Sequence, residues 1–235
     1  MHSHYNISSC GDHAITIEFG NAINKTTHQY VMVLFNYLSA LNIDSIKDII
    51  PAYTTVTIVY DVVAVKRQTS STAYQFIKAQ IENALQQLND DVEEQTSLVT
   101  IPVCYDTSLG IDLETIASQK NISIKGIINL HASTIYDVYM IGFLPGFAYM
   151  GVVDEKIATP RLSKPRMQVP AGSVGIAGNQ TGIYPLASPG GWNIIGQTPL
   201  KMFDINKPRP CLLNPGDKVQ FQPISLEEFN NYKQA

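Results

Sequence analysis

The chain has 235 residues, of which 45% are hydrophobic and 15% are charged, and its formal net charge is −4 at pH 7. This length suits one or two domains with a sizeable core, and the acidic balance gives no reason to expect nucleic acid or an anionic membrane as a partner. Residues 138–153 are apolar but short and interrupted by glycine and proline, and no signal peptide opens the chain, so we expect neither a membrane span nor export.

The first half of the chain alternates strand and helix patterns. We expect strands over residues 14–19, 46–50, 54–60 and 98–103, and helices over residues 24–41 and 72–88. Asn24 can cap the first helix, and Thr72-x-x-Gln75 forms a capping box for the second. Residues 89–95 form a polar, acidic connector. The order βαββαβ is that of a ferredoxin-like sandwich.

The second half of the chain is much richer in proline and glycine. Two prolines and four glycines precede residue 142, whereas eleven of each follow from there. Asp112 is placed to cap a short helix, and Ser123 to cap another that ends near His131. After Tyr136, short apolar runs separated by turns favour a closed β-barrel or sandwich. The chain as a whole therefore belongs to the α+β class.

Residues 167–200 contain no charged side chain. Their hydroxyl and amide groups can donate and accept hydrogen bonds, but they cannot supply an acid or a base near neutral pH. We therefore expect this segment to shape a pocket or an interface. Any proton-transfer group must come from elsewhere in the chain or from another chain.

Glycines in this segment do not form a phosphate-binding loop. Gly172, Gly175 and Gly178 lie three residues apart, which is neither of the familiar nucleotide motifs. Tight turns and close backbone approach explain them better. Ser173 and Ser188 lie outside a nucleophile-elbow motif, so a Ser/His/Asp triad is not expected either.

Four side chains carry the remaining chemistry, each with two open interpretations. His131 is either a general base or substrate hydrogen-bonding group, or a cap on the last carbonyls of its helix. Arg161 and Arg166 flank a proline-rich turn, where they either bind a carboxylate or phosphate or form a solvated basic turn. Trp192 is either a core anchor or an interface hot spot.

The three cysteines, Cys10, Cys104 and Cys211, are odd in number and far apart in the chain. They indicate neither a disulfide framework nor a metal-ligand pair, and no cluster of histidine and carboxylate has metal-ligand spacing. We therefore predict no metal site. Free thiols favour a cytoplasmic location.

Several long motifs carry a family resemblance that covers essentially the whole chain. GFLPGFAYMG, PRLSKPR, VPAGSVGIAGNQTGIYPLASPGGWNIIGQTP and LLNPGDKVQF resemble the allophanate hydrolase subunit 1 family. This family includes the KipI-like proteins and the B subunit of bacterial 5-oxoprolinase. The resemblance implies a ferredoxin-like N-terminal domain over residues 1–95 and a cyclophilin-like β-barrel domain over residues 96–235.

The resemblance also implies site residues. It assigns catalytic roles to His131, Arg161 and Arg166. It assigns substrate or partner binding to Phe143, Pro145, Gly146, Phe147, Pro170, Gly172, Gln180, Tyr184, Pro185, Ser188, Pro189, Gly190, Gly191 and Trp192. Two positions depart from the family pattern, with Asn193 in place of a frequent Gln and Gln197 in place of a frequent Arg. Recognition of ligand charge would then fall to the two arginines or to a partner.

The function implied by the resemblance is that of one component of a cytoplasmic 5-oxoprolinase, which uses a small-molecule substrate. This component works with two others, one of the LamB/YcsF type and one of the allophanate hydrolase subunit 2 type. Together they cleave 5-oxoproline to L-glutamate with ATP. Two alternatives share the same motifs: a KipI-type inhibitor of a sporulation histidine kinase, and the carboxyltransferase half of a urea carboxylase or allophanate hydrolase system.

Overall fold

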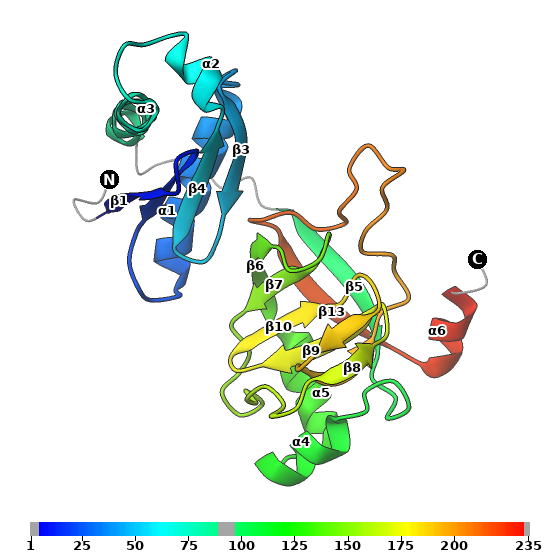
Figure 1. The fold of residues 1–235 in the computed structure, drawn as a ribbon. Helices are drawn as coiled ribbons and strands as arrows, with labels where there is room; N and C mark the ends of the chain where they lie inside the picture. Colours follow the sequence, from blue (N-terminus) through cyan, green and yellow to red (C-terminus); the bar gives the residue numbers. More distant parts are fainter. Residues whose placement is uncertain (1–4, 89–96, 233–235) are drawn as a thin grey trace. The chain divides into compact units, whose positions relative to one another are not determined.

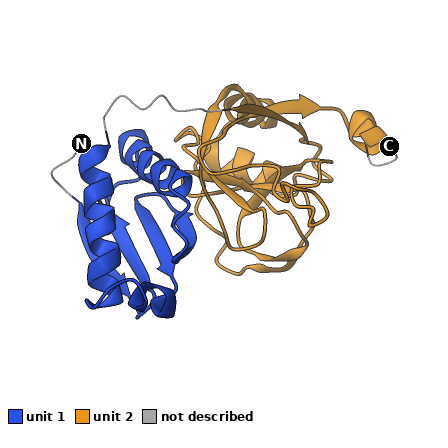
Figure 2. Ribbon diagram, turned by 90° about the horizontal axis from the view of Figure 1, so that it is seen from above, with its two compact units in different colours: residues 1–95 blue, residues 96–235 orange. Residues whose placement is uncertain are grey.

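The computed structural model describes residues 5–88 and 97–232, so the connector expected at residues 89–95 lies outside the described part. The chain divides into two compact units, residues 1–95 and residues 96–235 (Figure 2). None of the helices in the described ranges combines the length and apolar character needed to cross a bilayer.

The N-terminal unit is one antiparallel sheet with helices packed on it (Figure 1). Its strands, in the spatial order β1-β2-β4-β3, are β1 (Asn6–Cys10), β2 (Ala14–Glu18), β4 (Thr55–Tyr60) and β3 (Ile46–Pro51). Its helices are α1 (Lys25–Ala40), α2 (Val62–Lys66) and α3 (Ala73–Gln87). Leu34 of α1, Ile58 of β4 and Ile77 of α3 are fully buried in its core. This is a ferredoxin-like arrangement, as the sequence predicts.

One strand of that prediction was wrong. Residues 98–103 were expected to complete the ferredoxin-like sheet, but they form β5 (Leu98–Cys104) of the second unit. The edge position beside β2 is taken instead by β1, which pairs with β2 from Asn6 to Cys10. The segment NISSC is largely exposed and lacks apolar alternation, so it carries no pattern that predicts a strand.

The predicted helix caps are confirmed where the hydrogen-bond partner lies a few residues away in the chain. The Asn24 side chain accepts the Thr27 N–H at 2.8 Å, and Thr72 and Gln75 form the predicted capping box. The Ser123 side chain accepts the Gly126 N–H, as expected.

The C-terminal unit is a closed barrel, which confirms the predicted α+β class with a β-barrel. Its strands, in the order β10-β7-β6-β13-β5-β12-β9, are β10 (Gln180–Ile183), β7 (Ala148–Gly151), β6 (Ile135–Ile141), β13 (Lys218–Ile224), β5, β12 (Asn193–Gln197) and β9 (Ser173–Ala177). A separate ribbon pairs β8 (Arg166–Val169) with β11 (Ser188–Gly190). The helices are α4 (Leu113–Lys120), α5 (Ile124–Ser133) and α6 (Leu226–Tyr232).

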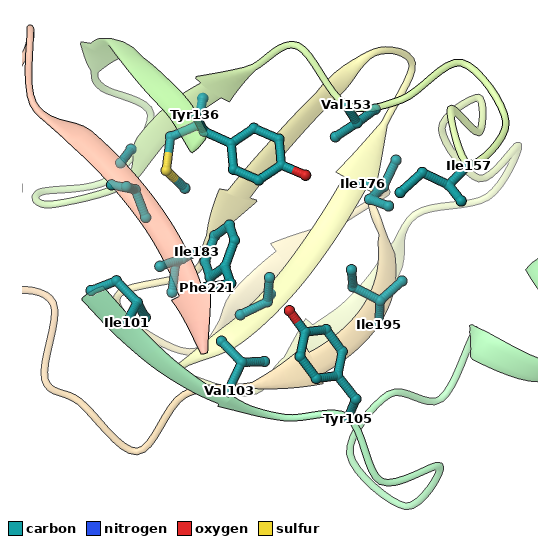
Figure 3. Packing of buried hydrophobic residues seen from close by; sticks show 14 of the residues in the cluster. Ile101, Val103, Tyr105, Tyr136, Val153, Ile157, Ile176, Ile183, Ile195 and Phe221 are labelled. Carbon is teal, nitrogen blue, oxygen red and sulfur yellow. The ribbon is translucent and has the colours of Figure 1, made fainter. Parts of the chain in front are cut away.

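Apolar side chains fill the barrel interior (Figure 3). Ile101, Ile176 and Phe221 come from different strands and converge there. α5 packs against β13, so its buried face contributes to the same core.

A second buried group, called here the outer cluster, comprises Phe147, Val169, Ala177, Tyr184, Trp192 and Ile194. Successive strand residues point to opposite faces. Ile194 lies in the outer cluster and Ile195 in the barrel core, so β12 is covered on both faces. β9 is also buried along its whole length. The strands β9 and β12 within residues 167–200 are thus buried on both faces, which explains why much of this segment carries no charge.

Candidate functional site

Arg161 lies over the outer cluster. Its guanidinium carbon is 5.9 Å from the centroid of the Trp192 ring, within the range of a cation–π contact. Trp192 is only 5% exposed, so the indole forms a floor rather than a projecting contact, which favours the core-anchor interpretation. Leu162 N–H donates to the Gly191 carbonyl at 2.8 Å and ties the Arg161 loop to the residues before β12. Within residues 5–88 and 97–232, no carboxylate forms an ion pair with Arg161.

Two tyrosines extend this floor. The Tyr149 ring centroid is 5.8 Å from that of Trp192, and Tyr184 meets Phe147 edge-on at 5.2 Å. Burial raises the pKa of both phenols, and the nearby charge of Arg161 only partly offsets that rise. Both hydroxyls are therefore neutral at physiological pH. We call Arg161, Trp192, Tyr149 and Tyr184 the arginine shelf.

Arg166 has a different environment. Its Nη2 donates to Asp112 Oδ1 at 2.6 Å, and its Nη1 donates to the Trp192 carbonyl at 3.4 Å. The other Asp112 oxygen accepts the Ile194 N–H at 2.6 Å. The Asp112 side chain is 8% exposed and that of Arg166 is 28% exposed. Arg166 is thus a clamp on the start of β12, and the solvated-turn interpretation is wrong for it.

Asp112 corrects a sequence prediction. It was expected to cap α4 with its side chain, but it makes no such cap hydrogen bond. Both carboxylate oxygens are engaged by Arg166 and Ile194, which are distant in the sequence. A local capping pattern carries no signal for those partners.

His131 lies inside the barrel and is fully buried. Its Nδ1 is 2.8 Å from the Tyr105 hydroxyl, and its Nε2 is 2.9 Å from Thr181 Oγ1. The Thr181 hydroxyl donates to the Gly175 carbonyl at 3.1 Å, so Thr181 accepts from Nε2–H and Tyr105 donates to Nδ1. The result is a fully satisfied relay, Tyr105 to His131 to Thr181 to Gly175.

This relay limits what His131 can do chemically. Burial lowers the pKa of His131 to about 3, so the ring is neutral. Both ring nitrogens are engaged, which leaves no lone pair or N–H for a substrate. The capping interpretation is also wrong, because the Leu130 carbonyl accepts from the Thr134 hydroxyl instead. The Tyr136 hydroxyl donates to the His131 carbonyl at 3.0 Å, and Figure 3 shows the phenol oxygens of Tyr105 and Tyr136 pointing into the barrel.

The other predicted binding residues divide by exposure. Four are exposed: Phe143, Pro145, Pro170 and Pro189. Three are half-buried: Gln180, Gly190 and Gly191. The rest are buried: Gly146, Phe147, Gly172, Tyr184, Pro185, Ser188 and Trp192. Half of the fourteen are therefore buried, and three of these, Phe147, Tyr184 and Trp192, belong to the outer cluster.

Sequence reasoning missed four residues of this region. Asp112 was assigned a different role, and Tyr105, Tyr149 and Thr181 were not singled out. Tyr149 lies within the motif GFLPGFAYMG and alternates with the barrel-facing Ala148 and Met150, so strand period was the signal that could have found it. Tyr105 and Thr181 contact His131 only through the closure of the barrel.

Two surface depressions lie at other residues of the described part. One lies in the N-terminal unit between the end of α1 and β3, lined by Asn42 and Lys47 among others. Another is lined by residues 208–211 and Asn214. The shelf residues line neither of these depressions. Within the described ranges, no three His, Cys, Asp or Glu side chains are grouped so as to hold a metal ion.

Comparison with known proteins identifies close relatives. A family model described as "Carboxyltransferase domain, subdomain C and D" matches residues 5–213. The chain is 40% identical to the 5-oxoprolinase B subunit of Bacillus subtilis over 98% of this chain and 97% of that protein. It is 47% identical to the Escherichia coli O157:H7 protein of the same name, over 57% of this chain and 62% of that protein.

Solved structures give the same picture of the fold. TTHA0988 matches with a TM-score of 0.78 and 33% identity, over 91% of this chain and 40% of that one. The chain therefore spans well under two thirds of TTHA0988. PH0987 from Pyrococcus horikoshii matches with a TM-score of 0.56 and 38% identity, over 95% of this chain and 100% of that one.

Proposed function

The chain belongs to the family of the carboxyltransferase domain, subdomain C and D, and we propose that it is the B subunit of an ATP-dependent 5-oxoprolinase. The observation that carries this proposal is its 40% identity to the Bacillus subtilis protein of that name, which extends over almost the whole of both chains. The assembled enzyme hydrolyses the lactam of 5-oxoproline to L-glutamate together with a LamB/YcsF-type partner and an allophanate hydrolase subunit 2-type partner. We place it in the cytoplasm, where ATP is available and where its three free cysteines remain thiols.

The chemistry requires activation of a stable amide. Transfer of the γ-phosphoryl group of ATP to the lactam oxygen makes the carbonyl carbon electrophilic. Water then adds to that carbon, and the C–N bond breaks as the nitrogen takes a proton. The acyl phosphate that results is hydrolysed by a second water to the side-chain carboxylate of glutamate and phosphate. Positioning and anion stabilisation are the main demands of such a reaction.

Arg161 is the group that this chain offers to the substrate. Its guanidinium is exposed, free of a carboxylate partner within the described ranges, and held over Trp192. A planar guanidinium held on an aromatic floor suits bidentate binding of the 5-oxoproline carboxylate. Arg166 supports this site from beneath, because its clamp on Asp112 and Trp192 fixes the floor.

We assign the ATP phosphates to the other two components. The glycines of residues 172–178 have N–H groups that already serve the barrel. Gly172 N–H donates to the Tyr184 carbonyl and Gly178 N–H to the Thr159 carbonyl, each at 2.7 Å. Gly175 lies in β9 between its two neighbouring strands. These glycines therefore cannot cradle phosphate without opening the sheet.

The same reasoning predicts half of an active site. Residues 167–200 supply no acid or base, and the buried relay engages both nitrogens of His131. We therefore propose that a partner supplies the base for the attacking water. We expect the isolated chain to be inactive.

A reconstitution assay tests the proposal. The chain is purified with its LamB/YcsF-type and subunit 2-type partners, singly and together, and glutamate release from 5-oxoproline is measured with and without ATP. Turnover only in the complete mixture supports the proposed role. Robust turnover by this chain alone would refute the half-site, and no turnover in the complete mixture would refute the function.

A carboxyltransferase half is the second candidate. It is favoured by the family description and by a 39% identity over 66 residues to the urea amidolyase of Lachancea kluyveri, which covers 4% of that protein. This role requires a biotin-carrier partner. Carboxyl transfer from carboxybiotin to urea in the same mixture, in place of 5-oxoproline cleavage, would select it. The third possibility, inhibition of a sporulation histidine kinase, predicts reduced kinase autophosphorylation with no turnover of either substrate.

A further inference from the structure

The turn between β6 and β7 holds an exposed aromatic side chain in an unusual backbone conformation. Phe143 has φ 67° and its side chain is 61% exposed. Leu144 N–H donates to the Gly142 carbonyl at 2.8 Å, which closes a three-residue turn around Phe143. A positive φ is rare for a bulky residue, and a γ-turn with positive φ is strained.

The surroundings of the turn keep Phe143 in that conformation. Gly142 N–H donates to the Phe147 carbonyl at 3.1 Å, and Phe147 N–H donates to the Leu144 carbonyl at 3.0 Å. Gly146, at φ 83°, lies against Phe203, where an added Cβ would come within 2.9 Å of the Phe203 Cβ. Phe147, at the base of the turn, is fixed in the outer cluster.

The Phe143 ring packs against one aromatic neighbour and is otherwise largely exposed. It meets Phe147 at a right angle with centroids 5.6 Å apart, and Phe143 is 61% exposed. Strain at a residue with so little intramolecular contact points to a function outside the chain. A rigid, exposed benzyl group is typical of an anchor that fills an apolar pocket of a protein partner.

We propose that Phe143 is the anchor by which this chain inserts into the subunit 2-type partner, an inference that rests on the proposed function and deepens it. The choice of a polypeptide occupant follows from the comparisons. Relatives of this chain are named as one subunit of an enzyme, and in TTHA0988 the matching region is joined to further polypeptide that makes up most of that chain. A small polar lactam offers no apolar pocket for a benzyl group, whereas a protein surface does.

Affinity measurements on the full-length chain test the anchor. Dissociation constants for the purified subunit 2-type partner are measured by isothermal titration calorimetry with the wild type, Phe143→Ala, Phe143→Gly and Phe143→Trp. We expect the Ala and Gly variants to bind at least about 30-fold more weakly, and Trp to recover most of the loss. Ile135→Ala, a 51% exposed side chain on β6, is the matched control and should bind like the wild type.

Stability measurements separate the anchor from a folding role. Glycine relieves the strained φ, so Phe143→Gly should keep a thermal midpoint near that of the wild type while losing affinity. Wild-type affinity in Phe143→Ala would overturn the inference, and so would failure of the wild type to bind this partner. A raised KM for 5-oxoproline with unchanged partner affinity would place Phe143 in the substrate pocket instead, again against the inference. Tight wild-type binding without glutamate release would refute the proposed function alone.

Discussion

Arg161 lies in the loop before β8 and Arg166 is the first residue of β8, yet the structure gives these close neighbours different roles. Arg166 donates to Asp112 and to the Trp192 carbonyl, whereas Arg161 is exposed and lies above the Trp192 ring. Their positions in the sequence could not distinguish them, because both follow a proline in the same basic turn. The difference arises from Asp112, which the fold brings to one arginine only.

Replacement of Arg161 should affect substrate binding in the assembled enzyme. Arg161→Ala removes the proposed carboxylate contact, and we expect KM for 5-oxoproline to rise about tenfold or more. Arg161→Lys should recover little, because an ammonium cannot make two parallel bonds to a carboxylate. Steady-state kinetics with saturating ATP measure both. Lys164→Ala, an exposed cation on the same loop, is the control, and a KM shift as large in that variant would show that only local charge matters.

At the scale of elements, the sequence correctly predicts features that depend on residues close together in the chain. The caps at Asn24, Thr72 and Ser123 were correct because each partner lies three residues away. The role of Asp112 was wrong because its partners lie 54 and 82 residues away. β5 was assigned to the wrong sheet for the same reason, since a strand pattern does not name its neighbours. The arginine shelf likewise depends on barrel closure, which no local pattern contains.

The Asp112–Arg166 pair should couple the start of α4 to β8 energetically. Asp112→Ala leaves a partly buried guanidinium unpaired and frees the Ile194 N–H, so we expect a loss of about 2 kcal/mol in unfolding free energy. A double-mutant cycle with Arg166→Ala, measured by urea unfolding, should give a coupling of about 1 kcal/mol or more. Additive effects of the two changes would contradict the clamp. The pair Lys201 and Asp204, whose lysine is 67% exposed, should show little coupling.

The buried relay should make the barrel sensitive to acid. His131 has a reference pKa of 6.5 when unfolded and about 3 when folded, because burial disfavours the imidazolium. As the pH falls, the unfolded state therefore binds the proton before the folded state does. The contribution of neutral His131 to the free energy of unfolding is fully present above pH 6.5 and is lost as the pH drops toward 3. A shift of this size corresponds to a loss of about 5 kcal/mol across the window.

Urea unfolding between pH 7.5 and 4.5 measures this dependence. Some carboxyl groups, such as those of Asp61 and Asp204, have a pKa that hydrogen bonds lower in the folded state. Their stabilising contribution is lost only at lower pH, as the pH falls through that folded-state pKa. His131→Gln removes the titration, so its stability should be lower at pH 7.5 but nearly flat down to pH 4.5. A wild-type slope that persists in this variant would assign the acid sensitivity to other groups.

At the scale of the whole molecule, the two units have separate main cores within the described residues. One is centred on the sheet and helices of residues 1–95, and the other on the barrel of residues 96–235. Each core draws its buried side chains from its own unit, as independent domains do. The shelf, the clamp, the relay and Phe143 all belong to the second unit.

This division predicts that a fragment of residues 96–235 folds alone and still binds the subunit 2-type partner. Its barrel is closed, its relay is internally satisfied, and the turn around Phe143 is supported by Gly146 and Phe203 of the same unit. We expect its thermal midpoint to lie within about 3 °C of the matching transition in the full chain, a difference of roughly 1 kcal/mol. The subunit 2-type partner should bind the fragment nearly as tightly as it binds the full chain. The Phe143→Ala fragment should lose this affinity. A fragment with poorly dispersed amide resonances would show that residues 1–95 complete the barrel, while a folded fragment that fails to bind would place part of the interface on the first unit.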